Sequence, residues 1–280
     1  MTTPGAGTLV LVATPIGNLG DLSPRAVRAL AEADVVACED TRRTRALLSH
    51  AGVAAAHRLV TVNDHTEAAQ VRALLARLDA GQQIALVTDA GMPAVSDPGE
   101  RLVAAAAAAG HRVEVVPGPS AALAALVVSG LPTGRFCFEG FLPRKGGARS
   151  ERLAGLVPER RTTVLFEAPH RVRQTAADLA AALDPLRALV VARELTKAFE
   201  DVWRGTVGSA PGHLAATEPR GEYVLVLGGA PPPGPAGPAD VEAALRARLD
   251  AGTDKRSAIA EVATELGVPK RQVYDAATRL

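Results

Sequence analysis

The sequence predicts an α/β protein that has two α/β domains and a small C-terminal helical extension. Three observations lead to this fold class. Short Val- and Leu-rich runs alternate with helical patterns in the first half of the chain, as they do in a parallel sheet. The last strand-like runs lie too close together for crossover helices, so the second half predicts a mixed sheet. A Pro- and Gly-rich segment precedes the final helices, and the expected divisions are domains at 1–132 and 133–229, a linker at 230–239 and an extension at 240–280.

Four continuous apolar runs in the first half are typical of parallel strands that are buried on both faces. They are TLVLVATP at 8–15, DVVACED at 34–40, QIALVTDAG at 83–91 and RVEVVPGP at 112–119. Helical patterns lie between them, at 23–33, 41–52 and 64–81. This alternation predicts a binding crevice at the carboxyl ends of the strands.

Residues that favour helix ends support two of these helices. Ser23 is the expected N-cap of the first helix, and Pro24 suits its first helical position. Asp64 and Glu67 have the spacing of a capping box at the start of the third helix, and Gly81 is the expected C-cap.

Five further apolar runs follow a boundary that we place between Leu131 and Arg135. They are FCFEGF, TTVLFEAP, ALVVARELTK, FEDVWRG and GEYVLVLGG. One or two helices lie between them, the clearest at 170–183. In the extension, the segment 258–278 has the helix–Gly-turn–helix pattern of nucleic-acid-binding modules. A helical hairpin that packs on the body explains that pattern equally well.

The composition is that of a soluble protein of a reducing compartment. The 280 residues are 48% hydrophobic and carry a formal net charge of +1, which allows a sizeable core and argues against an overall polycation. Cys38 and Cys137 predict no disulfide framework, and the histidines lack metal-binding spacing. No signal-peptide pattern is present, and the longest apolar tract, 102–109, is too short to cross a bilayer. We therefore expect a cytoplasmic protein with no membrane contact and no metal.

Each apolar run of the first half ends in a loop of unusual composition, namely ATPIGNLGD, CEDTRR, TDAGMPAVSDPG and PGPSAA. Glycines allow close backbone approach to a ligand, and prolines stiffen a loop. One such loop is most often only a turn, whereas four at successive strand ends favour a site. The first loop matches neither phosphate-binding fingerprint, because its glycines are spaced G-x-x-G and no Gly-Lys-Ser follows. A neutral or zwitterionic ligand such as S-adenosylmethionine fits better.

Charged residues near these loops have two interpretations each. Asp89 either accepts hydrogen bonds from a ligand or only shapes a turn, while Glu39 and Asp40 are either acid/base groups or anions at a helix N-terminus. Two basic clusters are either a route for a phosphate backbone or solvated surface, and they comprise Arg42, Arg43 and Arg45, then Arg144, Lys145, Arg149 and Arg152. The second cluster is Gly-rich, which predicts a flexible loop that orders on binding.

An ordered set of motifs resembles a known family. TPIGNLGDLSPRA, CEDTRRTRALL, VTDAGMPAVSDPG, VPGPSAALAALVVSGLP, FCFEGFLPRK, FEAPHRV, ARELTK and GEYVLVL follow one another through residues 9–228. Each motif alone is modest evidence, whereas the ordered set is highly specific. Together they resemble the bacterial small-subunit ribosomal RNA cytidine-2′-O-methyltransferases, which are members of the tetrapyrrole-methylase-like superfamily.

The resemblance implies two α/β domains of tetrapyrrole-methylase type with S-adenosylmethionine in the cleft between them. It also implies a homodimer, and a target cytidine in the decoding region of small-subunit rRNA, either free or in the assembled small ribosomal subunit. Where the family commonly has Thr, this chain has Met92, so only a backbone contact is expected there. The cofactor-binding residues that the resemblance implies are Pro15, Ile16, Asp89, Ala90, Gly91, Met92, Ser120, Ala121, Glu167, Leu195, Thr196, Lys197, Gly221 and Glu222.

Methyl transfer to a ribose hydroxyl needs a base or a cation at the nucleophile. The candidates are Lys197, Glu167, Glu39 and Asp40, and the sequence does not choose among them. The alternative functions are a porphyrinoid (precorrin-type) methyltransferase and a non-enzymatic RNA-binding protein. A dinucleotide oxidoreductase ranks last, because the G-x-G-x-x-G fingerprint and its acidic partner are missing.

Overall fold

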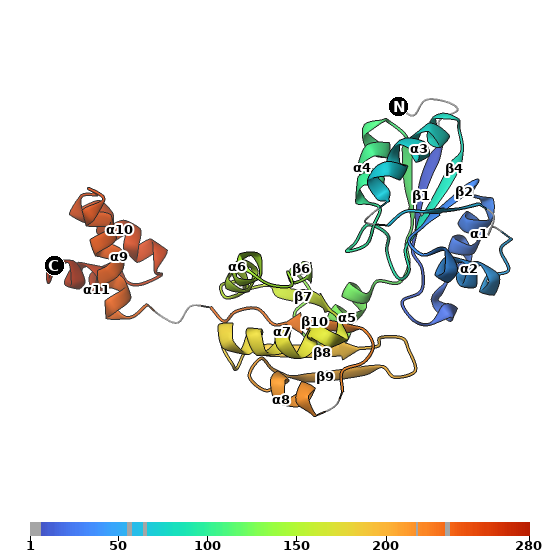
Figure 1. The fold of residues 1–280 in the computed structure, drawn as a ribbon. Coiled ribbons are helices and arrows are strands. Elements are labelled where there is room, and N and C mark those ends of the chain that lie inside the picture. Colours follow the sequence, from blue (N-terminus) through green and yellow to red (C-terminus); the bar gives the residue numbers. More distant parts are fainter. Residues whose placement is uncertain (1–6, 55–57, 64–65, 217, 233–235) are drawn as a thin grey trace. The chain divides into compact units, whose positions relative to one another are not determined.

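The computed structural model describes residues 7–54, 58–63, 66–216, 218–232 and 236–280. The chain folds into two compact units, Met1–Ala230 and Pro231–Leu280. The larger unit contains two five-stranded sheets, and the described residues of the smaller unit form helices (Figure 1).

A parallel sheet forms the first half of the larger unit. Its strands lie in the order β3-β2-β4-β1-β5, and every neighbouring pair is parallel. This result confirms the parallel sheet that the continuous apolar runs predict. The strands are β1 (Thr8–Val12), β2 (Val35–Cys38), β3 (Leu59–Thr61), β4 (Gln83–Val87) and β5 (Arg112–Val116).

Helices cover both faces of this sheet. Helices α1 and α2 pack on the face that carries Val10 and Val36, and helices α3 and α4 pack on the face that carries Leu9 and Val35. Successive strand residues point to opposite faces, which is why strands buried on both sides are apolar throughout. The helices are α1 (Pro24–Glu32), α2 (Thr41–His50), α3 (Glu67–Asp79) and α4 (Glu100–Ala108), and a short 3-10 helix η1 spans Leu19–Asp21.

The predicted cap residues of α1 and α3 are in place. The Ser23 hydroxyl accepts the Ala26 N–H at 3.1 Å, and Gly81 follows α3 with a φ of +81°. Three elements, β3, α4 and α5 (Ala121–Ser129), are missing from the sequence-based expectation. β3 has only three residues, α4 is mostly alanine and α5 is almost wholly apolar, so none leaves a clear apolar period.

The prediction that Glu67 belongs to a capping box at the start of α3 is wrong. Its expected partner, Asp64, lies outside the described residues. Glu67 is the first residue of α3, and its buried carboxylate points to another helix. One oxygen, Oε1, accepts the backbone N–H groups that begin α4, at 3.1, 2.9 and 3.2 Å from Gly99, Arg101 and Leu102. Glu67 therefore caps a helix that starts more than 30 residues later.

The second half of the larger unit is a mixed sheet, as predicted. Its strands lie in the order β6-β7-β10-β8-β9, and only β6 and β7 pair in parallel. The register between these two strands shifts from Phe138 to Gly140, as at a β-bulge. The strands are β6 (Phe136–Phe141), β7 (Thr162–Glu167), β8 (Ala188–Arg193), β9 (Asp201–Thr206) and β10 (Tyr223–Leu227).

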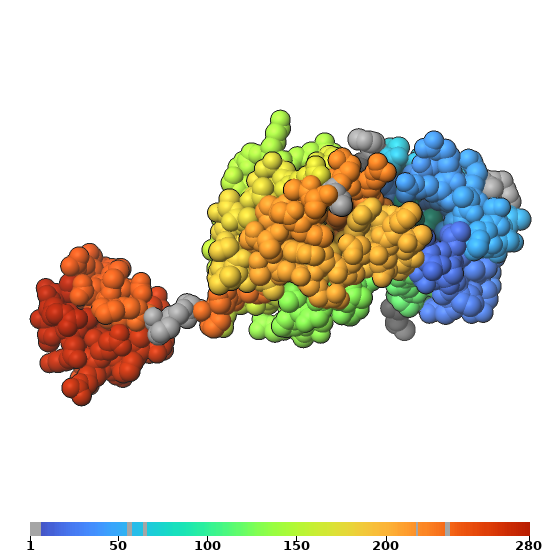
Figure 2. All heavy atoms as spheres, turned by 90° about the horizontal axis from the view of Figure 1, so that it is seen from below, coloured from blue at the N-terminus to red at the C-terminus, as the bar shows by residue number. Residues whose placement is uncertain are grey.

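Helices lie on both faces of the second sheet as well. One face carries Leu165 and is covered by α6 (Gly147–Leu156), α7 (Pro169–Ala182) and α8 (Ala210–Ala215). The other face carries Val164 and is covered by α5 (Ala121–Ser129), although α5 precedes the boundary expected from the sequence. Ile16, which follows β1, joins the same apolar cluster as α5. In the space-filling view, yellow and orange residues of the second sheet adjoin the blue start of the chain (Figure 2).

This half contains three helices between its strands, where the sequence predicts one or two. The unexpected α6 begins at Gly147, so the prediction of a flexible loop is wrong from that residue onward. The physical reason is Arg149, which is 8% exposed and whose guanidinium lies 2.6 Å from Asp178 of α7. That ion pair ties α6 to α7.

The C-terminal unit has its own hydrophobic core. Leu245, Val262 and Val273 are each 0% exposed and come from its three helices. The turn between the last two helices contains Gly267, with a φ of +63°, so the predicted helix–Gly-turn–helix is present. Its use in nucleic-acid binding stays a prediction. The helices are α9 (Pro238–Asp250), α10 (Lys255–Glu265) and α11 (Lys270–Ala277).

Candidate active site

A cavity of about 280 Å³ lies where loops of the first sheet face the second sheet. The loops that follow β1, β4 and β5 supply one wall, and the ends of β7, β8 and β10 supply the other. The structure brings together here nine of the residues for which a cofactor role is predicted, namely Ile16, Ala90, Gly91, Met92, Ser120, Ala121, Glu167, Leu195 and Glu222.

Main-chain hydrogen bonds hold the loops after β1 and β4 together. The Thr14 N–H donates to the Gly91 carbonyl at 2.9 Å, and the Gly91 N–H donates to the Thr14 carbonyl at 3.1 Å. Gly91 has a φ of +80°, a conformation that favours glycine. A Cβ at Gly91 would lie 3.4 Å from Cγ2 of Ile16, so this bridge also sets the position of Ile16 in the cavity wall.

The predicted set of site residues misses Val95, Ser96 and Asp97, which also line the cavity. They lie in the DAGMPAVSDPG loop, where Ala94 and Ser96 have φ values of +66° and +60°. Non-glycine residues in this region of φ are strained, and such strain clusters at functional sites. The sequence offers a signal for these residues, because the whole DAGMPAVSDPG motif follows a buried strand. The predicted cofactor role covers only the first four residues of that motif.

Aromatic rings from the second sheet are a further feature without a sequence-based assignment. Phe141 and Phe166 line the cavity, and their ring centroids lie 5.7 Å apart at an interplanar angle of 63°. Phe138 contacts Phe166 edge to face, with centroids 5.0 Å apart. Three of the five phenylalanines of the chain therefore gather at this site, and their concentration near FCFEGF was the available signal.

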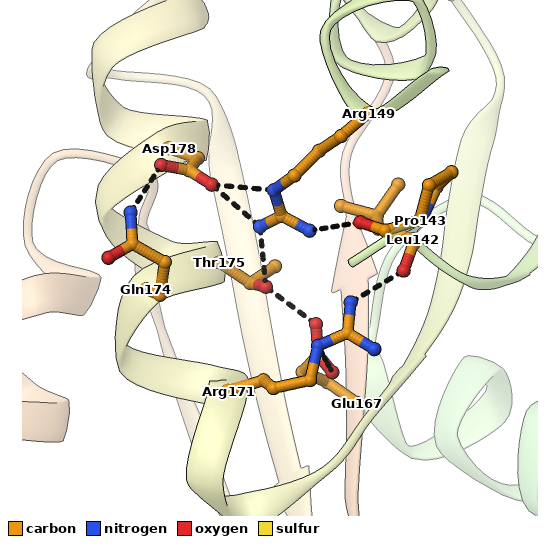
Figure 3. A network of polar contacts seen from close by, with 8 residues as sticks. All are labelled: Leu142, Pro143, Arg149, Glu167, Arg171, Gln174, Thr175 and Asp178. Atoms are coloured by element: carbon orange, nitrogen blue, oxygen red, sulfur yellow. Dashed lines mark hydrogen bonds and ion pairs between the residues drawn. The ribbon is translucent and has the colours of Figure 1, made fainter. Parts of the chain in front are cut away.

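Glu167 is buried in a polar network that extends away from the cavity (Figure 3). Its Oε1 accepts the Ala168 N–H at 2.9 Å and lies 3.3 Å from Nε of Arg171. Its Oε2 accepts the Thr175 hydroxyl at 2.5 Å, and that hydroxyl accepts a hydrogen bond from Arg149 at 3.0 Å. Both carboxylate oxygens have protein donors, which suits a residue that shapes the wall rather than one that removes a proton from a substrate.

Lys197 lies beside the cavity and is held by two carboxylates. Its Nζ donates to Oε1 of Glu194 at 2.8 Å and to Oε2 of Glu222 at 2.9 Å. Burial lowers the pKa of Lys197, but the hydrogen bonds and charges of the two glutamates outweigh burial, so the pKa is raised overall. Lys197 therefore stays protonated at neutral pH and acts as a cation.

The loop that carries Lys197 makes a close contact with the first loop of the chain. A Cβ at Gly17 would lie 2.3 Å from Cγ of Lys197, so glycine is required there. Glu194 and Thr196 have φ values of +51° and +67°, which marks this loop as strained too. A Cβ at Gly221 would lie 2.3 Å from Cδ of Glu194. Thr196, Lys197 and Gly221 thus stand next to the cavity, outside the set of residues that line it.

Pro15 and Asp89 do not line the first cavity, although both were predicted to bind the cofactor. They line a second cavity of about 260 Å³ together with Arg43 of α2. Oδ2 of Asp89 lies 3.4 Å from Nε of Arg43, and burial raises the pKa of Asp89. The two cavities share the same pair of loops.

Asp40 begins α2 as its N-cap, which confirms the second of its two interpretations. Its carboxylate accepts the Arg42 N–H at 2.7 Å and lies 3.0 Å from the Arg42 guanidinium. The side-chain hydrogen bond from Arg42 lowers the pKa of Asp40 to about 2, so this carboxylate is a poor base at neutral pH. Oε2 of Glu39 accepts the Asp89 N–H at 3.3 Å.

The seven basic residues proposed for RNA do not share one environment. Arg42, Arg43 and Arg45 lie on α2, and Arg144 and Lys145 precede α6; all five are exposed. Arg152 of α6 is exposed but paired with Glu139. Arg149 is buried in the network of Figure 3, so its side chain belongs to the fold and not to an exposed surface.

No group of three or more His, Cys, Asp and Glu side chains within the described ranges is placed to hold a metal ion. Across those same ranges, none of the helices has the length and apolarity that a membrane span requires. Cys38 is buried, Cys137 is partly buried, and both are free thiols.

The fold and the cavity together define a class of protein, in which two α/β domains enclose a small-molecule site between their sheets. Comparison with known families makes the assignment specific, since the model of the Tetrapyrrole (Corrin/Porphyrin) Methylases matches residues 8–211. The chain belongs to this family, and it is a methyltransferase.

Relatives of similar length support the assignment. Three proteins named Ribosomal RNA small subunit methyltransferase I align over nearly the whole chain. The one from Synechocystis sp. is 45% identical over 276 residues, which are 98% of each chain. The one from Mycobacterium tuberculosis (strain ATCC 25618 / H37Rv) is 46% identical over 272 residues, 97% of this chain and 94% of the relative. The one from Escherichia coli O157:H7 is 43% identical over 270 residues, 96% and 93%.

Solved structures resemble the larger unit. Uroporphyrin-III-C-methyltransferase from Thermus thermophilus is 27% identical, with a TM-score of 0.55 over 79% of this chain and 94% of that one. A structure of the same Thermus enzyme complexed with S-adenyl homocysteine is 25% identical, with a TM-score of 0.55 over 79% and 97%. The cobalt precorrin-4 methyltransferase structure, at 18% identity and a TM-score of 0.60 over 80% and 95%, shows the fold alone.

Proposed function

We propose that this methyltransferase transfers the methyl group of S-adenosylmethionine to the ribose 2′-hydroxyl of a cytidine in the decoding region of small-subunit ribosomal RNA. The observation that carries the proposal is the cavity between the sheets, which gathers nine residues of the family's cofactor loops. Relatives that are 43–46% identical over nearly the whole chain carry the name of an rRNA small subunit methyltransferase, which supports RNA as the acceptor.

The chemistry of the cavity fits this cofactor. None of the described residues that line it is Lys or Arg, so it offers no cationic side chain to a phosphate and does not repel a cation. The aromatic rings of Phe141 and Phe166 and the carboxylate of Glu222 suit a positively charged sulfonium. The loops at 90–92 and 120–121 present backbone groups that suit an adenosine and an amino-acid head.

S-adenosylmethionine supplies a methyl group that is already activated toward a nucleophile, so positioning of the acceptor provides much of the acceleration. The ribose hydroxyl develops negative charge as it attacks. Lys197 is a cation beside the cavity, and its partner Glu222 lines the cavity, so Lys197 is the group that we assign to stabilise the developing alkoxide.

The other three candidates have structural tasks in this arrangement. Asp40 caps α2, Glu39 accepts a backbone N–H after β4, and Glu167 anchors the start of α7. Their oxygens are held by donors of the protein itself. We therefore assign them the positioning of the two loops and of the cavity wall.

The RNA partner is assigned to two exposed basic stretches, on α2 and before α6. Arg42, Arg43, Arg45, Arg144 and Lys145 are exposed to phosphates of the rRNA or of the assembled small subunit, although Arg42 is paired with Asp40 and Arg43 with Asp89. A porphyrinoid acceptor is the second candidate, since the Thermus thermophilus enzyme acts on uroporphyrin-III by its name.

A homodimer is the oligomeric state that we propose, in the cytoplasm where small subunits are assembled. Helix α5 exposes Leu123 and Val127, which are 51% and 66% accessible, and β5 exposes Val115 at 48%. Exposed apolar side chains favour a protein contact. Sedimentation of the wild type as a dimer and of Val127→Glu as a monomer is expected, whereas a monomeric wild type contradicts this part of the proposal.

A map of ribose methylation in small-subunit rRNA tests the proposed function. A strain that lacks this protein should lose one 2′-O-methylcytidine, and purified wild-type protein with S-adenosylmethionine should restore it on subunits from that strain. An unchanged map removes the proposed function. Methyl transfer to a precorrin but not to subunits selects the porphyrinoid alternative.

A further inference from the structure

The second cavity is lined by the same two loops as the first. Pro15 lines the second cavity and Ile16 lines the first, and the same division separates Asp89 from Ala90. Successive residues of two loops thus line two neighbouring cavities.

The second cavity has an apolar body and a polar end. Pro15, Leu19 and Leu47 supply apolar surface. Asp89 and Arg43 place a carboxylate beside a guanidinium, with Oδ2 and Nε 3.4 Å apart, while Oδ1 of Asp89 accepts the Asp40 N–H at 3.2 Å and keeps a second lone pair for a ligand. This pairing presents an acceptor next to donors, which complements a flat ring whose edge carries a donor next to acceptors.

Thr88 lies in the wall of the second cavity and is 3% exposed. Its hydroxyl is buried and has no hydrogen-bond partner among the described residues, so the polar groups that face a ligand are those of Asp89 and Arg43.

We propose that the second cavity holds the base of the acceptor nucleotide, turned out of the RNA stack, and that Asp89 and Arg43 select cytosine over uracil there. The inference rests on the proposed function and adds the residues that set its base specificity. Asp89 accepts a hydrogen bond from the exocyclic amine, Arg43 donates to the acceptors of the ring edge, and Pro15 and Leu47 contact the ring.

The choice of cytosine follows from the order of donors and acceptors. Uracil has a carbonyl oxygen where cytosine has its amine, and that oxygen would face the Asp89 carboxylate without a hydrogen between them. A site that buries a polar group without its partner rejects the wrong ligand strongly.

The test compares methyl transfer to two small-subunit substrates, one with cytidine and one with uridine at the mapped acceptor position. Wild type should prefer the cytidine substrate in kcat/KM. In Asp89→Asn the amide offers a donor to the uracil oxygen, so this preference should fall roughly tenfold or more. The Kd of S-adenosylmethionine, measured by calorimetry, should stay within about twofold of wild type if Asp89 serves the base and not the cofactor.

Neighbouring arginines of α2 provide a matched control. Arg43→Gln removes a charge that lines the second cavity, and Arg42→Gln removes one on the same helix outside it. Both variants should weaken transfer to RNA, but only Arg43→Gln should change the ratio between the cytidine and uridine substrates. If Asp89→Asn does not fold, Arg43→Gln and its control Arg42→Gln still measure the ratio between the cytidine and uridine substrates.

The outcomes separate this inference from the proposed function. An unchanged base preference in Asp89→Asn and Arg43→Gln, with normal cofactor affinity, overturns the base cavity and leaves rRNA methylation standing. A large loss of cofactor affinity in Asp89→Asn assigns Asp89 to the cofactor and also overturns it. A wild-type protein that methylates neither substrate refutes the proposed function itself, and the inference falls with it.

Discussion

The charge of Lys197 is decided by the two glutamates that hold its ammonium group. The hydrogen bonds to Glu194 and Glu222 raise its pKa above the ordinary 10.5 despite partial burial. A lysine in this state cannot accept a proton from a ribose hydroxyl near neutrality, yet it can stabilise the oxygen as charge develops. The raised pKa of Lys197 therefore favours a cation that stabilises the alkoxide over a base that removes the proton, two mechanisms between which the sequence does not choose.

Substitution of Lys197 by Met tests the cationic role. We expect methyl transfer to fall by about tenfold or more, by the same factor at every pH from about 6.5 to about 9, because a fixed charge is lost and no titrating base is removed. The measurement is single-turnover methylation of small subunits. A wild-type rate that climbs about tenfold per pH unit, with the climb absent from Lys197→Met, would instead identify a base.

Stability should also respond to pH through this lysine. The folded-state pKa is raised, so its stabilising contribution is complete below the ordinary pKa of 10.5 and is lost as pH rises through the higher folded value. In urea unfolding above pH 10.5, wild type should therefore lose more stability than Lys197→Met. Equal losses in the two proteins contradict the raised pKa.

At the scale of the element, α4 depends on a carboxylate from α3. Three backbone N–H groups at the start of α4 converge on one oxygen of Glu67, which is 6% exposed. A negative charge at this point also favours the helix dipole. The start of α4 follows the loop at 92–99 that lines the cavity, so this contact supports the site from behind.

Glu67→Ala should destabilise the protein by about 2 kcal/mol or more, because three buried donors lose their acceptor. Glu67→Gln keeps an acceptor oxygen and should lose less. The exposed Glu100, in the first turn of the same helix, is the matched control, and Glu100→Ala should stay within about 0.5 kcal/mol of wild type. Urea denaturation measures all three, and an equal effect of Glu67→Ala and Glu100→Ala contradicts the cap.

Helix α6 offers a second comparison between a buried and an exposed arginine. Arg149 joins α6 to α7 through Asp178 and Thr175 (Figure 3). Arg152, by contrast, has a side chain that is 54% exposed, and it pairs with Glu139. Arg149→Ala should cost about 3–5 kcal/mol of stability, because it leaves Asp178 without its cationic partner and removes the donors to Thr175 and to the Pro143 carbonyl. Arg152→Ala should cost about 1 kcal/mol or less. Denaturation midpoints that are lowered equally contradict the structural role of Arg149.

At the scale of the whole molecule, the chain divides its hydrophobic residues among separate cores. Residues 231–280 have a core of their own, and the two sheets of the larger unit share the chain from β1 to β10. The site is built entirely from the larger unit, because all the lining residues of both cavities precede residue 230. Stability of the small unit and cofactor binding are therefore expected to vary independently.

Leu245→Ala tests this independence in the full chain. The side chain is 0% exposed in the C-terminal core, so its truncation should cost that unit about 2–5 kcal/mol. Differential scanning calorimetry should show one transition lowered and the other unchanged, with the Kd of S-adenosylmethionine preserved. The control is Leu179→Ala in α7, which should lower the other transition. A single transition that shifts in both variants contradicts two separate cores.

Local patterns in the sequence were enough for the two sheets, for the helices α1, α2, α3 and α7, and for the three loops that line the first cavity. Continuous apolar runs predict strands that are buried on both faces, and Ser23 and Gly81 mark helix ends because their effects are confined to neighbouring backbone groups. Ordered motifs predict the family, and nine cofactor-loop residues do meet at one cavity. Short or alanine-rich elements such as β3 and α4 escape this reasoning because they lack a period.

Only the tertiary structure decided which cavity each loop residue lines and with which residue a charged side chain forms an ion pair. Ile16 and Ala90 line one cavity while their neighbours Pro15 and Asp89 line another. Arg149 is buried by an ion pair with Asp178, 29 residues further along. The physical reason is the same in each case: these contacts join segments that are distant in sequence, so no local pattern encodes them.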